Sequence, residues 1–339
     1  MSKPIYHSAR KIYHTLTWVK RLFHNCCTAK KHFGRTYANL CFLNDISIHF
    51  DSRNKEKHIS RKNHYIKTYL KKQLVEVLNT YANSPSVSNC AEDEKKIWLF
   101  WWDGIDSAPD IVKACINSVI IAASSIPVVL LDKNNIYDYI TIPNDIQQKH
   151  SEGVIGHAHF SDILRLSLLA KYGGQWIDAT VFFSKPVPDK MIRAPFFTCK
   201  MDVYDPLVPS HYLWAGWILG GNKQFPLFTF ARDALIQYWR LHDHLIDYLL
   251  MDYIFDLAYE EIPEVHQAIN ELECNNPDRH ELMKHLNDPY FSKFFDRDTY
   301  FYKLSYRYGA PKVSTSTGMT TFYGHIINEM LKEASWHDI

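Results

Sequence analysis

The chain has 339 residues, of which 46% are hydrophobic, 14% aromatic and 22% charged. This composition supplies enough apolar side chains for a packed core and excludes an intrinsically disordered protein. The length suits one large domain, or one domain with an appended segment. The net charge of +1 conceals an asymmetry, because residues 1–90 contain 16 of the 38 Lys and Arg but only 4 of the 37 Asp and Glu. The net charge is therefore +12 over residues 1–90 and −11 over residues 91–339.

The basic N-terminal segment, residues 1–90, is expected to be mainly helical. Apolar residues recur along it among lysines and arginines: Tyr13, Leu16, Trp18, Val19, Leu22, Phe23, Ile66, Leu70, Leu74 and Leu78. Such a segment is typical of a surface that binds an anionic membrane, here over residues 1–72, and nucleic acid is a less favoured partner. The alternative is a helical lobe that docks on the acidic remainder of its own chain. We expect a linker at residues 83–89 and a second domain over residues 91–339.

Several features favour a reducing, cytoplasmic location. The N-terminus lacks the apolar run and the small-residue cleavage site of a signal peptide. The most apolar stretch, residues 111–131, contains Lys113, Asn117 and Pro127, so it predicts a helix and a strand and not a membrane span. The cysteines are odd in number, seven, and form no CxxC pair.

From residue 96 the pattern predicts alternating strands and helices. Apolar runs typical of buried strands occur at 96–102, 127–131, 175–183, 196–201 and 212–219. Helices are expected at 109–124, 134–140, 143–150 and from a cap at 161 or 162 to the glycines at 173–174, and the stretch 225–269 is expected to be mostly helical. This alternation predicts an α/β fold with parallel strand pairing. In such sheets, ligands bind beyond the carboxyl ends of the strands.

Residues 157–183 place charged residues around a helix, a glycine break and a strand. Ser161 or Asp162 is expected to cap the helix, and two adjacent glycines end it. Asp162 and Arg165 are three residues apart and therefore share one helix face. Asp178 lies in an apolar strand, where an unpaired carboxylate would cost several kcal/mol, so it needs a cation, a sugar hydroxyl or a strong donor. Each feature alone is explained by ordinary structure, but together they indicate a binding site.

The residue types of this stretch suit a nucleotide sugar. Trp101, at the end of the first strand, can stack on a flat base. Asp162, Arg165 and Asp178 can supply two acceptors and one donor for phosphate or hydroxyl groups. No GxSxG elbow and no HExxH zinc motif is present, which argues against a serine hydrolase or a zinc enzyme.

Three motifs resemble the capsular polysaccharide synthesis family, a bacterial group of glycosyltransferases with a DXD-type sugar-binding region. They are the segment that begins with KIW at 96–98 and ends with AP at 108–109, HFSDILR at 159–165 and YGGQWIDAT at 172–180. The resemblance extends over residues 60–325 and includes 247–252 and 302–307. It implies a GT-A (Rossmann-like) fold with a mixed, mostly parallel sheet, flanking helices and a helical C-terminal part.

The resemblance also implies a function. It is the transfer of a sugar from a nucleotide sugar, most simply a UDP-sugar, to a glycan or lipid-linked acceptor in capsular or other surface polysaccharide synthesis. Related enzymes often retain the anomeric configuration, which implies a retaining hexosyltransferase. Such an enzyme would be cytoplasmic and peripheral at the inner face of the cell membrane. The alternative function is a non-catalytic carbohydrate-binding or assembly protein of a polysaccharide locus.

Individual donor-binding roles follow from the resemblance. Trp101 matches the aromatic residue that stacks on uracil. Ser161, Asp162 and Arg165 match the SDxxR motif that holds the donor sugar and phosphate. Trp176 is the aromatic residue before the DXD region, and Asp178 is its first acid and the candidate metal ligand.

The catalytic candidates are Asp178, Arg165 and Asp252. Thr180 replaces the usual second acid, and a hydroxyl is a poor Mn²⁺ or Mg²⁺ ligand beside a carboxylate. Either a later residue, for which His325 is a candidate, completes a metal site, or Arg165 and Lys303 neutralise the diphosphate. Asp247 and Asp252 are candidates for the acceptor side or for a base, with helical salt bridges as the alternative.

Overall fold

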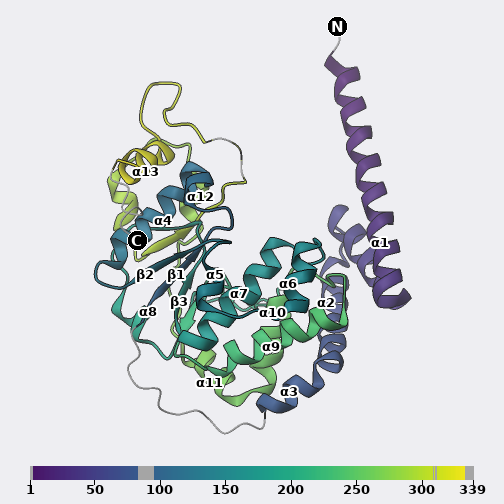
Figure 1. Cartoon of the computed structure of the whole chain (residues 1–339). Coiled ribbons are helices and arrows are strands. Elements are labelled where there is room, and N and C mark those ends of the chain that lie inside the picture. Colours follow the sequence, from purple (N-terminus) through teal and green to yellow (C-terminus); the bar gives the residue numbers. More distant parts are fainter. Residues whose placement is uncertain (1–2, 83–94, 308, 310, 333–339) are drawn as a thin grey trace.

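We describe the protein from a computed structural model that covers residues 3–82, 95–307, 309 and 311–332, with the side chains of residues 3–14 outside the description (Figure 1). The domain boundary expected after residue 90 and the linker expected at 83–89 therefore lie outside the described residues. The side chain of Tyr13 lies outside them as well.

A five-stranded sheet forms the centre of the protein, with strand order β2-β1-β3-β6-β5. Its strands are β1 (Ile97–Phe100), β2 (Val128–Leu131), β3 (Gly174–Ile177), β5 (Phe196–Thr198) and β6 (Ile218–Gly221). Strand β1 pairs in parallel with β2 and β3, whereas β6 runs antiparallel to β3 and β5. Four strands thus share one direction, and the expected α/β fold with a mixed, mostly parallel sheet is confirmed.

Helices cover both faces of this sheet because its strands are apolar on both sides. In β1, Trp98 and Phe100 belong to one buried cluster, and Ile97 and Leu99 belong to the other. The first cluster includes helices α7 (His157–Tyr172), α9 (Pro226–Leu241) and α10 (Leu250–Glu261). The second includes α4 (Asp110–Ala123) and α13 (Phe322–Met330). The carboxyl ends of the strands remain open for a ligand.

A small second sheet lies beside the first and corrects one expectation. The strand expected over 175–183 is two strands, because the chain turns at Asp178, whose carbonyl accepts a hydrogen bond of 2.9 Å from the Val181 amide. After this turn, β4 (Val181–Phe183) pairs antiparallel with β7 (Phe301–Lys303), and Val181 is opposite Lys303. Asp178 therefore lies between two sheets and not within a strand.

The start of α7 corrects a second expectation. The helix begins at His157 after Gly156, so Ser161 and Asp162 lie in its second turn and cap nothing. The extra turn is stabilised by ring contacts, since Trp102 packs on His157 at 4.8 Å and on Phe160 at 5.8 Å. The end of the helix is as expected, with Gly173 at φ 66° after the last helical residue.

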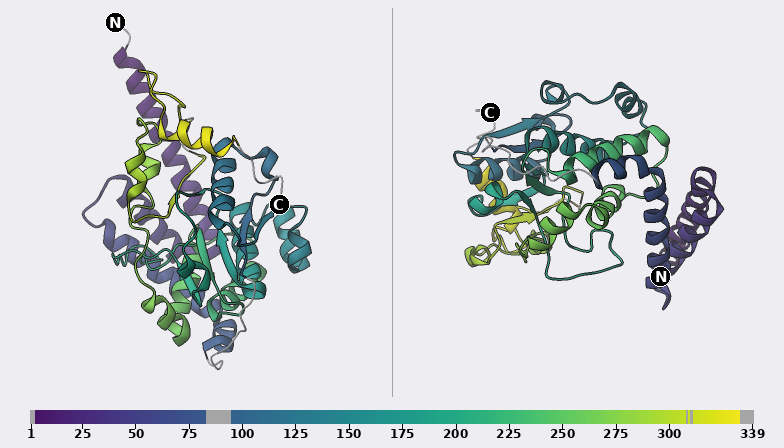
Figure 2. Two further views of the ribbon diagram at one scale, coloured as in Figure 1. Left: turned by 90° about the vertical axis from the view of Figure 1, so that its left-hand side faces the viewer. Right: turned by 90° about the horizontal axis from the view of Figure 1, so that it is seen from below.

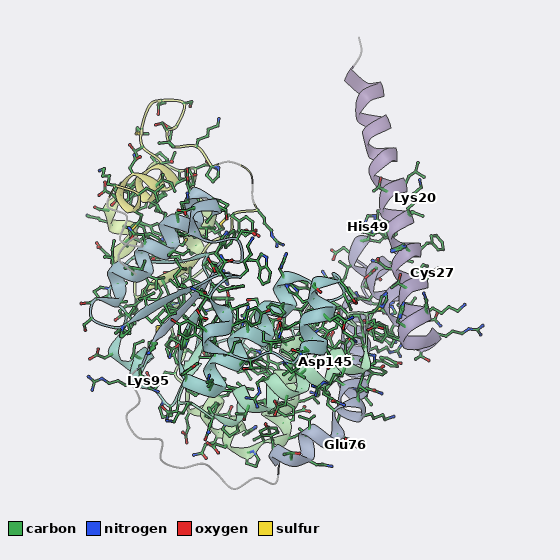
Figure 3. The ribbon with its side chains drawn as sticks, viewed as in Figure 1. Lys20, Cys27, His49, Glu76, Lys95 and Asp145 are labelled. Carbon is green, nitrogen blue, oxygen red and sulfur yellow. The ribbon has the colours of Figure 1, made fainter. Side chains whose placement is uncertain are left out.

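The N-terminal segment is helical, as expected, and consists of α1 (Lys3–His49), α2 (Lys55–Gln73) and α3 (Val75–Ala82). Helix α1 bends at Gly34, whose φ of 89° is outside the helical region. Its two parts lie side by side, because Trp18 stacks on His49 at 3.8 Å. The first part projects away from the rest of the protein (Figures 1 and 2). Figure 3 shows Lys20 and Cys27 on this projecting part.

Helix α2 docks on the acidic body through ion pairs with α10. The Lys67 ammonium is 2.8 Å from the Asp256 carboxylate and 2.6 Å from that of Glu260. Lys62 lies 2.8 Å from Asp247, three residues before α10 begins. Part of the positive charge of the N-terminal segment thus forms ion pairs with the acidic body. The alternative of a helical lobe that docks on its own chain predicts such pairs.

The remaining elements are short connections around this core. They are η1 (Ile105–Ser107), α5 (Ile136–Tyr139), α6 (Asn144–Ser151), α8 (Asp189–Arg193), α11 (Pro263–Glu271), α12 (Glu281–His285) and η2 (Ser292–Asp296). Within the described ranges, no helix is both long and apolar enough to cross a membrane. The six cysteines of those ranges are free thiols.

Candidate active site

A cavity of about 480 Å³ lies at the carboxyl ends of β1 and β3. Its lining includes seven of the residues that the sequence assigned to catalysis or donor binding: Trp101, Ser161, Asp162, Arg165, Trp176, Asp178 and Asp252. These residues come from separate motifs along the chain. The fold brings them together because β1 and β3 are parallel neighbours, so their carboxyl ends meet at one edge of the sheet.

Arg165 is the buried cation of this cavity, with only 7% of its surface exposed. Its Nη2 atom is 3.1 Å from Asp162 Oδ1 and 3.6 Å from Asp178 Oδ1. Its Nη1 atom donates a hydrogen bond to the Gly216 carbonyl, and its guanidinium lies 5.1 Å from the centre of the Trp176 ring. The guanidinium is therefore fixed in position between two carboxylates.

Asp178 is held by donors on both of its oxygens. The Trp176 indole donates to Oδ1 at 2.9 Å, and the Lys303 ammonium is 2.8 Å from Oδ2. Burial alone would raise the pKa of Asp178, but the charges of Lys303 and Arg165 outweigh it and hold the pKa below its usual value. The carboxylate is ionised at neutral pH.

Lys303 occupies the space between Asp178 and Thr180. Its Nζ atom is 2.7 Å from the Thr180 hydroxyl. The pairing of β4 with β7 fixes this position, because the Leu304 amide donates to the Thr180 carbonyl at 2.8 Å. The ammonium is also 5.7 Å from the centre of the Trp217 ring. Lys303 is thus placed by backbone pairing and by three neighbouring side chains.

Asp252, in the first turn of α10, is a cavity residue with a raised pKa. Burial raises its pKa to about 6 against the opposing effect of a hydrogen bond from the Trp214 indole at 2.9 Å, and the negative charge of Asp162 raises it further. A carboxyl group with this pKa is mostly ionised at pH 7 and becomes protonated as the pH falls through about 6.

Two other candidates lie elsewhere. Asp247 forms the ion pair with Lys62 described above and does not line this cavity, whereas its neighbour Tyr248 does. His325 is in α13, stacks on Tyr290 at 3.6 Å and is absent from the lining around Asp178. The structure therefore brings Asp252 to the site and leaves Asp247 and His325 outside it.

A second cavity, of about 780 Å³, adjoins the first. The two share the residues Asp178, Thr180, Tyr248, Tyr306 and Arg307. The boundary is partly aromatic, since the rings of Trp101 and Tyr306 meet edge to face at 5.3 Å. A ligand in the first cavity can therefore meet a second ligand across this boundary.

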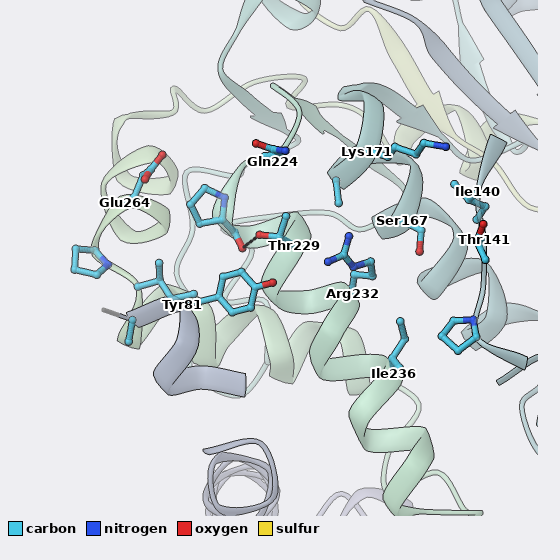
Figure 4. Close-up of a pocket in the computed structure, with 16 residues that line it drawn as sticks. Tyr81, Ile140, Thr141, Ser167, Lys171, Gln224, Thr229, Arg232, Ile236 and Glu264 are labelled. Atoms are coloured by element: carbon cyan, nitrogen blue, oxygen red, sulfur yellow. Dashed lines mark hydrogen bonds between the residues drawn. The ribbon is translucent and has the colours of Figure 1, made fainter. Parts of the chain in front are cut away.

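A larger cavity, of about 830 Å³, lies near the amino end of β3 (Figure 4). Both of its cationic side chains are already paired: Lys171 donates to the Tyr139 carbonyl at 2.6 Å, and Arg232 donates to the neighbouring Asp233 at 2.7 Å. It lies away from the carboxyl ends of the strands. We therefore assign the candidate active site to the smaller cavity.

A divalent cation does not fit the residues around Asp178. Thr180 takes the place of a second acid, and the Lys303 ammonium already binds the oxygens of both residues. Over the part of the chain that the structure describes, no group of three or more His, Cys, Asp and Glu is arranged to hold a metal ion. A metal ion here would also be repelled by Lys303 and Arg165.

The sequence did not point to the segment before β6. Asp178 donates its amide to the Trp217 carbonyl at 2.9 Å, Gly216 accepts from Arg165, and Trp214 donates to Asp252. These residues were assigned to a strand over 212–219, but β6 starts only at Ile218. Because β6 is antiparallel to β3, the residues before it lie beside the end of β3. The only sequence signal that this segment belongs to the site was a pair of tryptophans, Trp214 and Trp217, on either side of Gly216.

The family model described as "Capsular polysaccharide synthesis protein" matches residues 46–326. The chain belongs to the capsular polysaccharide synthesis protein family. The match includes α2, the whole central sheet and Lys303, so the expected family membership is confirmed.

One curated relative is the "O-glycosyltransferase braB" of Annulohypoxylon truncatum, which is 30% identical to this chain over 135 residues. This stretch is 37% of the present chain and 30% of the relative, so the similarity covers less than a third of that protein.

Proposed function

We propose that this protein is a glycosyltransferase that transfers a sugar from a UDP-sugar to a glycan or lipid-linked acceptor of surface polysaccharide synthesis. The observation that carries the proposal is the meeting of Asp162, Arg165 and Asp178 in one cavity at the strand ends, with Trp101 in its wall. Membership of the capsular polysaccharide synthesis family and the partial similarity to an O-glycosyltransferase support the class of reaction.

The cavity offers a partner for each part of a UDP-sugar. Trp101 is partly exposed and presents a ring for the uracil. Asp162 and Asp178 accept hydrogen bonds from sugar hydroxyls, and Arg165 donates to the sugar and the diphosphate. Because Arg165 is fixed by both carboxylates, it meets the donor with little loss of side-chain entropy.

The reaction needs charge stabilisation more than a strong acid. When the bond between the anomeric carbon and the β-phosphate oxygen breaks, negative charge develops on the diphosphate, and fixed cations such as Arg165 stabilise it. The sugar gains oxocarbenium character, which an ionised Asp252 stabilises from the same cavity. A bond then forms from the acceptor oxygen to the anomeric carbon, and the acceptor hydroxyl proton passes to the departing phosphate oxygen.

Donor binding tests the site. Asp162→Ala and Asp178→Asn are each expected to bind a UDP-sugar roughly 10- to 100-fold more weakly than the unaltered protein, since each removes a charged hydrogen-bond acceptor. Isothermal titration calorimetry measures this, with Asp189→Asn, on the exposed start of α8, as the matched control. If both site variants bind as tightly as the control, the site assignment is wrong.

The pH profile tests the role of Asp252. Its pKa of about 6 is above that of an ordinary carboxyl, so the group stays protonated to a higher pH. If the ionised form is required, kcat/KM falls as the pH decreases through that value and is level above it. Rates measured between about pH 5 and 8 reveal this decrease of kcat/KM at low pH. A rate that is constant across the range excludes an essential Asp252 carboxylate.

The stereochemical outcome is proposed to be retention. The proposal follows the related enzymes and fits an Asp252 that acts through its charge and not as a base. Proton NMR of the product formed from an α-linked UDP-hexose is expected to show an α-anomeric signal. A β-linked product would mean that the acceptor attacks from the opposite face.

We further propose that α1 binds an anionic membrane surface, which would bring the site to a lipid-linked acceptor. Its exposed apolar side chains are Leu16, Phe23, Leu43 and Ile48, and they are accompanied by the exposed cations Lys20, Arg21, Lys30, Lys31 and Arg35. Lys67 of α2 is ion-paired, whereas these cations form no ion pair with another residue that the structure describes. Exposed apolar and basic side chains on one helical element are complementary to anionic lipid.

Vesicle binding tests this surface. The triple variant Lys20→Glu, Lys30→Glu and Lys31→Glu is expected to bind phosphatidylserine-containing vesicles at least about 100-fold more weakly, because each surface cation contributes about 1 kcal/mol. The matched control reverses Lys190, Lys293 and Lys332, which are lysines of the body.

Co-sedimentation with vesicles measures both proteins. The membrane proposal fails if the triple variant sediments as well as the control, or if the unaltered protein sediments equally with pure phosphatidylcholine.

A further inference from the structure

The place where a metal ligand was expected holds an ammonium group. Lys303 Nζ lies 2.8 Å from Asp178 and 2.7 Å from Thr180, the two positions that correspond to the acids of a DXD region. The contact is not an incidental surface ion pair, because the Lys303 side chain is only 21% exposed and that of Asp178 27%. Val181 of β4 lies opposite Lys303 of β7, so strand pairing holds the Lys303 backbone beside Asp178 and Thr180.

The ammonium has capacity for one more partner. A lysine ammonium carries three N–H donors, and Asp178 and Thr180 use two of them. Lys303 lines the second cavity, which shares Asp178 and Thr180 with the donor cavity. Its remaining donor is therefore close to the boundary where the two cavities meet.

Other cations stand at the same boundary. Arg165 lies on the donor side, 3.6 Å from Asp178, and Arg307 lines both cavities. Three positive side chains thus line the two cavities, Arg165 the first, Lys303 the second and Arg307 both. Within the described lining, Asp178 is the one carboxylate that the two cavities share. A diphosphate, with its acceptor oxygens and negative charge, is the group that this arrangement suits.

We propose that the Lys303 ammonium takes over the role of a divalent cation: it binds the diphosphate of the nucleotide sugar, so that the protein binds and cleaves its donor without a metal ion. Asp178 then positions Lys303 and does not bind a metal. This inference rests on the proposed function, because it assumes a nucleoside diphosphate in the first cavity.

The first test uses the unaltered protein. Its affinity for UDP is measured by calorimetry in buffer with EDTA and in buffer with Mn²⁺. The expected dissociation constants agree within about twofold, because no bound metal contributes to either. A UDP affinity at least tenfold weaker in EDTA overturns the inference. Absence of UDP binding in both buffers contradicts the proposed function itself, so the two failures are distinct.

The second test removes the ammonium. Lys303→Ala is expected to bind UDP at least roughly tenfold more weakly in EDTA, since a charge-assisted contact to the diphosphate is lost. Lys190→Ala, an exposed lysine of α8, is the control. The thermal midpoints of both variants show whether they are folded. If Lys303→Ala is unfolded, the inference is decided by the first test alone, the UDP affinity of the unaltered protein in EDTA and in Mn²⁺. A folded Lys303→Ala that binds UDP like the control overturns the inference.

Discussion

The site depends on how the protein compensates the charge of Asp178 at the junction of its two sheets. Arg165 approaches from α7 and Lys303 from β7, and each is within ion-pair distance of this carboxylate. An uncompensated carboxylate in such a place would be costly, so the two cations and the indole of Trp176 are required for the turn that separates β3 from β4. The same cations, once fixed, are available to a negatively charged ligand. Structural stability and the proposed ligand binding therefore rest on one set of contacts.

The sequence predicted the parts of this site that lie on regular elements. The spacing of Asp162 and Arg165 predicted a shared helix face, and Trp101 was expected at the end of an apolar strand; all three line the one cavity. Contacts made by the antiparallel strands were harder to predict. The partnership of Lys303 with Asp178 joins residues 125 positions apart through the β4–β7 pairing, and no local pattern encodes that pairing.

The same reasoning explains the errors at element boundaries. Ser161 has the chemistry of a helix cap, but packing of Phe160 and His157 against Trp102 extends α7 by a further turn, so tertiary contacts overrode the local preference. The basic N-terminal segment had two interpretations, docking on the body and binding to a membrane, and the structure shows the first of them in α2. Lysines of α2 pair with acids of α10, whereas α1 leaves its own cations exposed beside apolar side chains.

The most direct test of the central claim, that this cavity cleaves a nucleotide sugar, is isotope-traced donor turnover without an acceptor. A set of UDP-sugars carrying radiolabel in the sugar is incubated with the protein, and free labelled sugar and UDP are separated and counted. Release of labelled sugar from at least one donor, abolished in Arg165→Ala, is the predicted result, because transferases hydrolyse their donors slowly when no acceptor is present. If no donor is cleaved although UDP-sugars bind, the protein is a carbohydrate-binding member of its family and not a transferase.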